Sequence, residues 1–176
     1  YEGLSIAEVA AMRGQEPYDA LFDLLSESEG SAVMGDVTQS EESLVKIMAH
    51  RQMCFGSDAL YSSARPHPRS FHAALHLIGR YVNERGDLSI EEAIERLTGR
   101  TARRLGLFGR GLIAEGYKAD LVLFDQDTLS GSDTFAEGGV SPLSLVMVNG
   151  EVALEAGRLV GTTSGRLLVP LTGRTD

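Results

Sequence analysis

The sequence predicts an α/β fold that is followed, from about Gly106, by a small antiparallel β unit. Two observations lead to this prediction. Before Gly106, segments with a helical period alternate with short apolar runs, which is typical of βα units and a parallel sheet. After Gly106, strand patterns rich in Gly, Asp and Val replace the helical ones. The 176 residues suffice for one domain, or for a small domain and part of a larger one.

Cap residues mark the beginnings of the first two predicted helices. Ser5 and Glu8 form a capping box, and the helix that they open is expected to end at Gly14. Pro17 suits the first position of a second helix, because its missing amide hydrogen is not needed there. The apolar stripe expected on the inner face of that helix consists of Ala20, Leu21, Leu24 and Leu25.

A strand, a helix and a second strand are expected next. Residues 32–37 predict a strand, and Thr38 or Ser40 is expected to cap the following helix. Residues 53–55 form a short apolar run that ends at Gly56, which predicts a buried strand leading into a loop. The apolar face of the helix between the two strands is predicted to be Leu44, Ile47 and Met48.

Further helices are predicted up to Gly106. Residues 71–85 have the pattern of a long amphipathic helix. Ser89 and Glu92 form a second capping box, whose helix is expected to reach Leu97, and Thr101 is expected to cap one more short turn. The inward-facing side chains of the long helix are predicted to be Phe71, Leu75, Ile78 and Val82.

The β unit after Gly106 is predicted from short apolar runs and turn residues. Asn149-Gly150 lies between two such runs and is the sequence signal for a hairpin with a type I′ turn. Gly157 is expected to turn the chain into the last strand. The predicted strands are residues 121–124, 145–148, 151–154 and 159–160.

Composition and charge narrow the class of function. The formal net charge is −9, and an acidic chain argues against sequence-independent binding to nucleic acid or to an anionic membrane surface. No apolar run approaches the length that spans a bilayer. Cys54 is the single cysteine, which excludes an internal disulfide and suits a reducing compartment. We therefore expect a cytoplasmic protein that binds neither nucleic acid nor membranes.

The candidate site lies just past the expected strand at residues 53–55. Asp58 follows its carboxyl end, where chemistry gathers in parallel α/β folds and above all in α/β barrels. The next loop carries Arg65, His67 and Arg69, separated by two prolines. A carboxylate facing a rigid cationic loop fits an acid/base residue with an anion clamp, and the planar guanidinium of Arg69 matches a carboxylate bidentately. The alternatives are a turn or capping aspartate at position 58 and a structural role for His67.

Two further patterns are not expected to form sites. His72 and His76 have the i, i+4 spacing of metal ligands, but the glutamate of a zinc-protease helix is absent between them, so a solvated or packing role is expected. Residues 109–114 fit a relaxed dinucleotide fingerprint. They follow a helix and precede strands, however, which is the reverse of the strand–turn–helix order that such a site requires.

Taken together, the motifs resemble the C-terminal part of the amidohydrolase superfamily, and most closely its N-acyl-D-amino-acid deacylases (D-aminoacylases). The Asp120 and Asn149 motifs are shared across the superfamily, whereas the Asp58 and Arg69 motifs look like the deacylase branch. Ala59 departs from the pattern, since the family more often has Gly there. The motifs that carry the resemblance are Gly56-Ser57-Asp58-Ala59-Leu60, Arg65-Pro66-His67-Pro68-Arg69, Gly111-Leu112-Ile113, Gly116, Ala119-Asp120-Leu121-Val122-Leu123-Phe124-Asp125 and Val148-Asn149-Gly150.

The resemblance implies both a fold and a reaction. Residues 1–105 would be the last βα units of a TIM-like (β/α)8 metal-dependent hydrolase barrel, and residues 106–176 part of a small antiparallel β-sandwich. The reaction would be zinc-dependent hydrolysis of the amide bond of N-acyl-D-amino acids, releasing a carboxylate and a free D-amino acid. Asp58 would be the general base and proton shuttle at the metal centre, Arg69 would bind the substrate α-carboxylate, and His67 would belong to the substrate site.

The resemblance also implies that most zinc ligands lie upstream of Tyr1. We expect the chain to be inactive by itself and to need the N-terminal half of the barrel or a partner chain, because four scattered histidines do not form that metal cage. Two alternatives stay open. One is a cyclic-amide hydrolase of the hydantoinase or dihydroorotase kind, and the other is a non-catalytic amidohydrolase fragment that acts through partner contacts.

Overall fold

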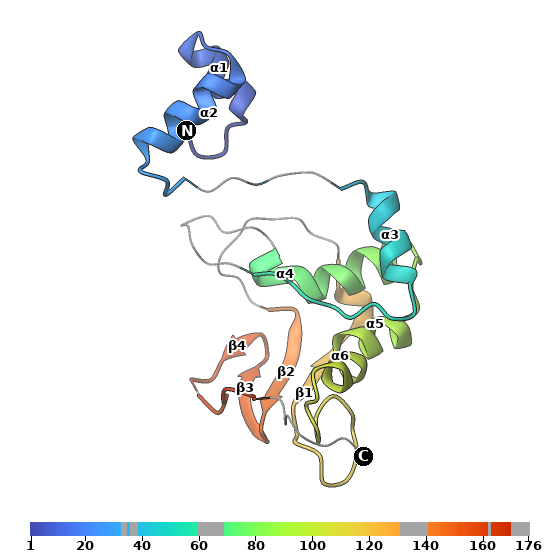
Figure 1. Ribbon diagram of the computed structural model, residues 1–176. Coiled ribbons are helices and arrows are strands. Elements are labelled where there is room, and N and C mark those ends of the chain that lie inside the picture. The colour runs from blue at the N-terminus through green and yellow to red at the C-terminus, as the bar shows by residue number, and fades with distance from the viewer. Residues whose placement is uncertain (33–34, 36–38, 60–68, 131–140, 162, 170–176) are drawn as a thin grey trace. The chain divides into compact units, whose positions relative to one another are not determined.

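A computed structural model describes residues 1–32, 35, 39–59, 69–130, 141–161 and 163–169 (Figure 1). By its contacts the chain divides into two compact units, Tyr1–Thr38 and Gln39–Asp176. Every described α-helix ends by Arg104, and every described strand begins at or after Leu121. The assignment of residues 1–105 to a barrel and of residues 106–176 to a sandwich stays a prediction. None of the described helices is long and apolar enough to cross a bilayer.

The first unit is a pair of helices, α1 (Ile6–Arg13) and α2 (Pro17–Glu27). The predicted capping box is confirmed, since the Ser5 hydroxyl accepts the Glu8 amide at 3.3 Å and the Glu8 carboxylate accepts the Ser5 amide at 2.7 Å. Gly14 ends α1 in the left-handed conformation, with φ at +64°. Both helices therefore begin where the local sequence predicts.

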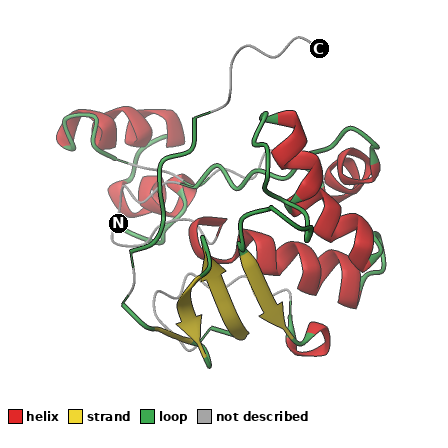
Figure 2. Ribbon diagram, turned by 90° about the horizontal axis from the view of Figure 1, so that it is seen from below, coloured by secondary structure: helices red, strands yellow, loops and turns green. Residues whose placement is uncertain are grey.

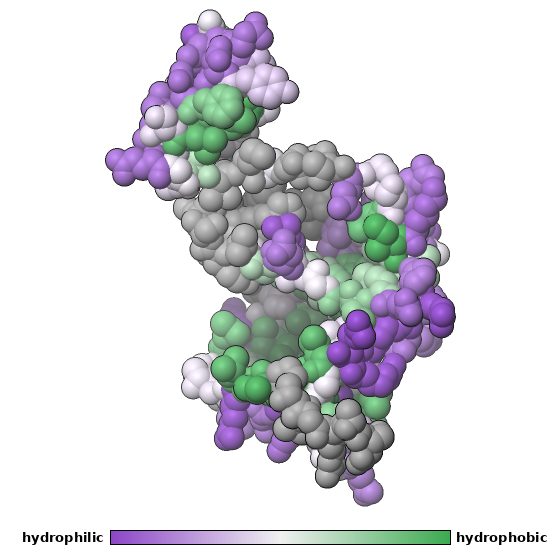
Figure 3. All heavy atoms as spheres, viewed as in Figure 1, coloured by the Kyte–Doolittle hydropathy of each residue, from purple (hydrophilic) through white to green (hydrophobic). Residues whose placement is uncertain are grey.

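Part of the apolar stripe predicted for α2 is exposed. Ala20 is buried, whereas Leu25 is 39% exposed. Figure 3 shows apolar side chains gathered on one face of this unit. Two short helices cover only one side of each other, so the stripe is wider than the contact between them. The other large apolar side chains exposed on the unit are Tyr1, Leu4, Met12, Tyr18 and Phe22.

The second unit begins with α3 (Glu41–Ala49). The Ser40 hydroxyl accepts the amide of Ser43 at 3.2 Å, so Ser40 caps this helix as one of the two predicted candidates. Thr38, the other candidate, and most of the strand predicted over residues 32–37 lie outside the described residues.

One continuous helical segment follows, and its winding changes halfway. It consists of α4 (Arg69–His76), which is α-helical, and η1 (Leu77–Glu84), which is a π-helix. The helix predicted over residues 71–85 is confirmed in place, and most of its predicted inner face is confirmed, since Ile78 is buried and Leu75 and Val82 pack against the core. Phe71, predicted to face inward, is only half-buried. The buried residues of η1 are Leu77, Ile78, Gly79 and Tyr81.

The predicted capping box of the next helix is also confirmed. α5 (Ile90–Leu97) begins with the Ser89 hydroxyl accepting the Glu92 amide at 3.2 Å and the Glu92 carboxylate accepting the Ser89 amide at 3.0 Å. α6 (Gly99–Arg104) follows after a break at Thr98. Each cap satisfies helix amides that have no partner within the helix.

The cap predicted at Thr101 is wrong. α6 begins after Thr98, and the Thr101 hydroxyl donates a hydrogen bond to the backbone carbonyl of Arg96 at 2.6 Å. Because this carbonyl belongs to the last turn of α5, where carbonyls lack helical partners, the hydroxyl ties α6 to α5.

The strands form an antiparallel sheet in the order β1–β2–β3–β4 (Figure 2). Asn149 and Gly150 have φ values of +52° and +88° at the centre of the β2–β3 hairpin, which confirms the predicted hairpin. Every strand pair among the described residues is antiparallel, so the parallel sheet predicted for the first part of the chain is not present in them. The strands are β1 (Leu121–Phe124), β2 (Leu143–Val148), β3 (Glu151–Glu155) and β4 (Arg158–Leu159).

The core of the second unit brings together α3, η1, α5 and the residue that follows the 3₁₀ turn η2 (Gln126–Thr128). Met53 and Phe55 pack against this core, which anchors the segment that leads to Asp58. Ile47, predicted to share the inner face of α3 with Met48, is 55% exposed. The buried members of the core are Met48, Leu77, Ile78, Tyr81, Leu88, Ala93 and Leu129.

Gly111 marks a close approach of the chain to α6. Its φ is +79°, and a Cβ atom built there would lie 2.8 Å from the Cβ atom of Ala102 and 3.0 Å from the carbonyl oxygen of Thr98. Gly109 also has a positive φ, +71°, but a Cβ atom there would meet nothing within 4 Å. This glycine-rich stretch is therefore a packing turn.

These two glycines give a matched test of the packing. Gly109→Ala should lower the free energy of unfolding by about 1 kcal/mol, through left-handed strain. Gly111→Ala carries the same strain and a steric clash, and should cost about 1–3 kcal/mol more. Urea unfolding of the two variants measures the difference. Equal losses would show that the close approach to α6 is absent.

Candidate functional site

The segment before Asp58 is extended, but it has no strand partner among the described residues. Instead, the Phe55 amide donates to the carbonyl of Arg96 at 3.3 Å, and the Arg100 guanidinium donates to the carbonyl of Met53 at 3.3 Å. Residues 53–55 are half-buried. The buried strand predicted here is therefore wrong for the described chain: the backbone is extended, but helices rather than a neighbouring strand satisfy its hydrogen bonds.

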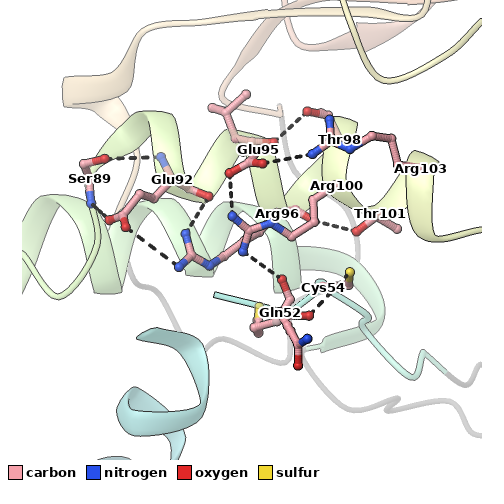
Figure 4. Close-up of polar contacts among 12 residues, drawn as sticks. Gln52, Cys54, Ser89, Glu92, Glu95, Arg96, Thr98, Arg100, Thr101 and Arg103 are labelled. Carbon is pink, nitrogen blue, oxygen red and sulfur yellow. Dashed lines mark hydrogen bonds and ion pairs between the residues drawn. The ribbon is translucent and has the colours of Figure 1, made fainter. Parts of the chain in front are cut away.

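A cluster of charges on α5 and α6 holds this contact in place (Figure 4). The Glu95 carboxylate accepts one hydrogen bond from Arg100, at 2.5 Å, and another from Arg103, at 3.0 Å. The side chain of Arg100 is 19% exposed and that of Arg103 is 61% exposed. Of these two arginines, Arg100 is the one that reaches the backbone of residue 53.

Arg96 is the buried charge of the same helix. Its side chain is 2% exposed, and its guanidinium donates to the carbonyl of Glu92 at 2.9 Å and lies 3.9 Å from the Glu92 carboxylate. Its own carbonyl accepts the hydroxyl of Thr101 and the amide of Phe55. The polar atoms of Arg96 therefore join α5, α6 and the segment that carries Asp58.

Asp58 and Arg69 lie together in the structure. Nη2 of Arg69 is 3.1 Å from Oδ2 of Asp58, although ten residues separate them in the chain. The Asp58 side chain is 82% exposed and that of Arg69 is 39% exposed, so the pair is open to solvent. Asp58 has a φ of +50°, a left-handed conformation that aspartate tolerates. His67, the third predicted site residue, lies outside the described residues.

An open hollow of about 510 Å³ lies beside the same segment. Neither Asp58 nor Arg69 lines it, and Lys46, which does, is paired with Glu42 in an exposed i, i+4 contact along α3. We therefore place the candidate site at the ion pair of Asp58 and Arg69. The hollow is lined by Lys46, Ile47, His50, Gln52, Met53 and Cys54.

The described residues do not form a metal centre on their own. Nowhere among them do three His, Cys, Asp or Glu side chains come together in a way that could hold a metal ion. The rings of His76 and Tyr81 meet edge to face at 5.7 Å, and the ring of His72 lies 6.2 Å from that of Phe71. Asp58 offers a single carboxylate, so a metal ion at this position requires donors other than those described.

The Asp120 and Asn149 motifs have a structural role in the β unit. Arg110 donates to the carboxylate of Asp120 and, at 2.6 Å, to the side-chain oxygen of Asn149. The Asp120 carboxylate accepts a hydrogen bond from the backbone amide of Asn149 at 2.8 Å. The side-chain amide of Asn149 donates to the backbone carbonyl of Ser164 at 2.7 Å. These bonds fix the β2–β3 turn against the chain that precedes β1, and none of them involves Asp58 or Arg69.

The local sequence did not predict the cluster around Glu95. Arg100 lies five residues after Glu95, outside the i, i+4 spacing that marks helical ion pairs. The carbonyl that Arg100 reaches is 47 residues away in the chain, so no local pattern points to it.

The charges of this cluster predict a pH dependence of stability. The hydrogen bond from Arg100, above all, lowers the pKa of Glu95 from its usual value of 4.5. Because the folded pKa is the lower one, the stabilisation is present above pH 4.5 and is lost as the pH falls through the folded value. Glu95→Gln should therefore flatten the fall of the urea midpoint between about pH 5 and pH 3.

Arg100→Met should flatten part of the same curve, because the Glu95 carboxylate keeps its hydrogen bond from Arg103. The double variant should be no flatter than Glu95→Gln alone, since that change already removes the titrating carboxylate. A double variant that equals the sum of the single ones would contradict this coupling.

Comparison with known proteins gives one family match. A model of the amidohydrolase family matches residues 3–153. The D-aminoacylase of Alcaligenes xylosoxydans xylosoxydans is 34% identical over 168 residues, which cover 94% of this chain and 34% of that protein. The chain thus spans about a third of the length of the curated relatives it matches.

Two solved structures are similar along most of the chain. A D-aminoacylase with a binuclear metal centre matches with a TM-score of 0.80 and 31% identity, covering 95% of this chain and 35% of that one. The N-acyl-D-glutamate deacylase of Bordetella bronchiseptica, in complex with zinc and a phosphonate mimic of the tetrahedral intermediate, matches with a TM-score of 0.72 and 30% identity. That match covers 86% of this chain and 31% of the deacylase.

Proposed function

The chain belongs to the amidohydrolase family, and from this premise we propose that it provides part of the active site of an N-acyl-D-amino-acid deacylase. The reaction is the hydrolysis of the amide bond, which releases a carboxylate and a free D-amino acid. The observation that carries the proposal is the pair of Asp58 and Arg69, because it sets a base beside a group that binds carboxylates. The similarity to D-aminoacylase supports the same substrate class.

Asp58 is the proposed general base and acid. Its carboxylate is exposed and can take a proton from the attacking water and return it to the leaving amine nitrogen. The zinc that we propose as cofactor supplies, when bound, Lewis-acid activation of the water. Asp58 belongs to that metal centre in our proposal, and the other ligands come from outside the described residues.

Arg69 is the proposed binding residue for the α-carboxylate of the substrate. It is the first residue of α4, and a guanidinium fork can donate hydrogen bonds to both oxygens of a carboxylate at once. In this structure the Asp58 carboxylate contacts one of the two terminal nitrogens of that guanidinium, Nη2. His67, two residues before Arg69 in the sequence, is a proposed substrate contact.

The fold that we propose for the whole protein follows the two solved relatives. Residues 1–105 contribute the last βα units of a TIM-like barrel, and residues 106–176 part of a β-sandwich. The TM-score of 0.80 against a D-aminoacylase supports this arrangement. We also propose a cytoplasmic location, from the single cysteine Cys54.

Replacing Asp58 tests the proposed chemistry. In the complete, metal-loaded protein, Asp58→Asn should lower kcat for N-acyl-D-amino acids by about 10²–10⁴-fold, because the amide cannot carry the proton. Because Asp58 is also a proposed metal ligand, kcat is compared per bound metal ion, and the thermal midpoint should stay close to that of the wild type, which separates chemistry from folding. A variant that keeps its metal and retains wild-type kcat would remove Asp58 from the reaction.

Replacing Arg69 tests the proposed substrate class. Arg69→Ala should raise KM for N-acyl-D-amino acids by at least about tenfold, since a charged hydrogen bond contributes roughly 1.5–3 kcal/mol. An N-acyl amine without a carboxylate serves as the control substrate and should show a much smaller change. Equal effects on both substrates would mean that Arg69 does not bind the α-carboxylate.

A further inference from the structure

We propose that Arg100, held by Glu95, is a positioning residue that fixes the backbone of residues 53–55 and, through it, the carboxylate of Asp58. The catalytic part of this inference rests on the proposed function. The backbone contact rests on geometry alone, so the two parts can be tested separately.

The contacts with residues 53–55 reproduce what a neighbouring strand would offer. A parallel strand donates to the carbonyl before a given residue and accepts from the amide after it. Around Cys54, Arg100 donates to the carbonyl of Met53 and the carbonyl of Arg96 accepts the amide of Phe55, both at 3.3 Å. A side chain of α6 and the backbone of α5 thus take the place of one strand, and the segment stays extended.

Glu95 holds the guanidinium of Arg100 in place. Its other terminal nitrogen donates to Glu95 at 2.5 Å, and Glu95 is held in turn by Arg103 (Figure 4). A guanidinium can serve two acceptors in fixed directions, which the point charge of a lysine cannot do as well. Because Glu95 fixes the fork, less side-chain entropy is lost when Arg100 binds the carbonyl of Met53.

The segment transmits this restraint to the site. Asp58 is three residues after Phe55, and its left-handed φ of +50° sets the direction of its side chain relative to the extended backbone. A slip of the backbone at residues 53–55 would displace the carboxylate from its place beside Arg69. Displacements of about 1 Å at a catalytic group can cost about 10²-fold in rate.

Arg103 provides a matched control for the experiment. Arg100→Met and Arg103→Met each remove one positive charge and one partner of Glu95 from the same helix, but only the first removes the bond to Met53. Amide hydrogen exchange at Phe55, measured in the complete protein, reports directly on the extended segment. We expect exchange at least about tenfold faster in Arg100→Met than in Arg103→Met, and an intermediate rate in Arg100→Lys.

Activity gives the second readout. Arg100→Met should lower kcat for an N-acyl-D-amino acid by about tenfold or more with little change in KM, whereas Arg103→Met should stay near the wild type. Equal exchange at Phe55 in the two methionine variants would overturn the positioning role, whatever the activity. Faster exchange with unchanged kcat would overturn its catalytic part. A wild-type protein without deacylase activity would instead contradict the proposed function, and the exchange result would still decide the backbone contact.

Discussion

The hydrogen bonds between α5, α6 and the backbone of residues 53–55 are the constraint on which the candidate site depends. An extended segment with unpaired backbone groups is unfavourable against a hydrophobic core, because each buried polar group without a partner costs free energy. Here Arg96 and Arg100 supply the partners, and Met53 and Phe55 can then pack against the core. Asp58 lies three residues after Phe55, and our proposal is that these helix–backbone contacts place its carboxylate.

Arginines organise the second unit, although the chain is acidic overall. Arg100 links two helices to the segment before Asp58, and Arg110 links Asp120 to Asn149 in the β unit. In both places the planar guanidinium serves two acceptors at once. The Asp120 and Asn149 motifs resemble those of the wider superfamily. Their hydrogen bonds therefore serve to hold the fold of the β unit. The Asp58 and Arg69 motifs bear on the proposed reaction.

Local signals predicted the elements well, and the faces that they bury only in part. The capping boxes at Ser5 and Ser89 and the hairpin at Asn149 depend on neighbours within a few residues, and all three are confirmed. Ile47 was expected inside and is exposed, because burial depends on what lies opposite a helix. Ile78 was expected inside and is buried, whereas Tyr81, which was not expected inside, is also buried where the winding changes to π.

The sequence by itself determined where most helices and strands begin, which turn joins β2 to β3, and that the motifs around Asp58 and Arg69 resemble a deacylase site. Only the tertiary structure decided that Asp58 meets Arg69 at 3.1 Å. It also decided that Arg100, bonded to Glu95, binds the backbone of Met53 in the segment before Asp58. The physical reason is the separation along the chain between the groups that interact. Caps and turns satisfy hydrogen bonds with neighbours three or four residues away, whereas Arg100 satisfies a carbonyl 47 residues distant, whose position exists only in the folded chain.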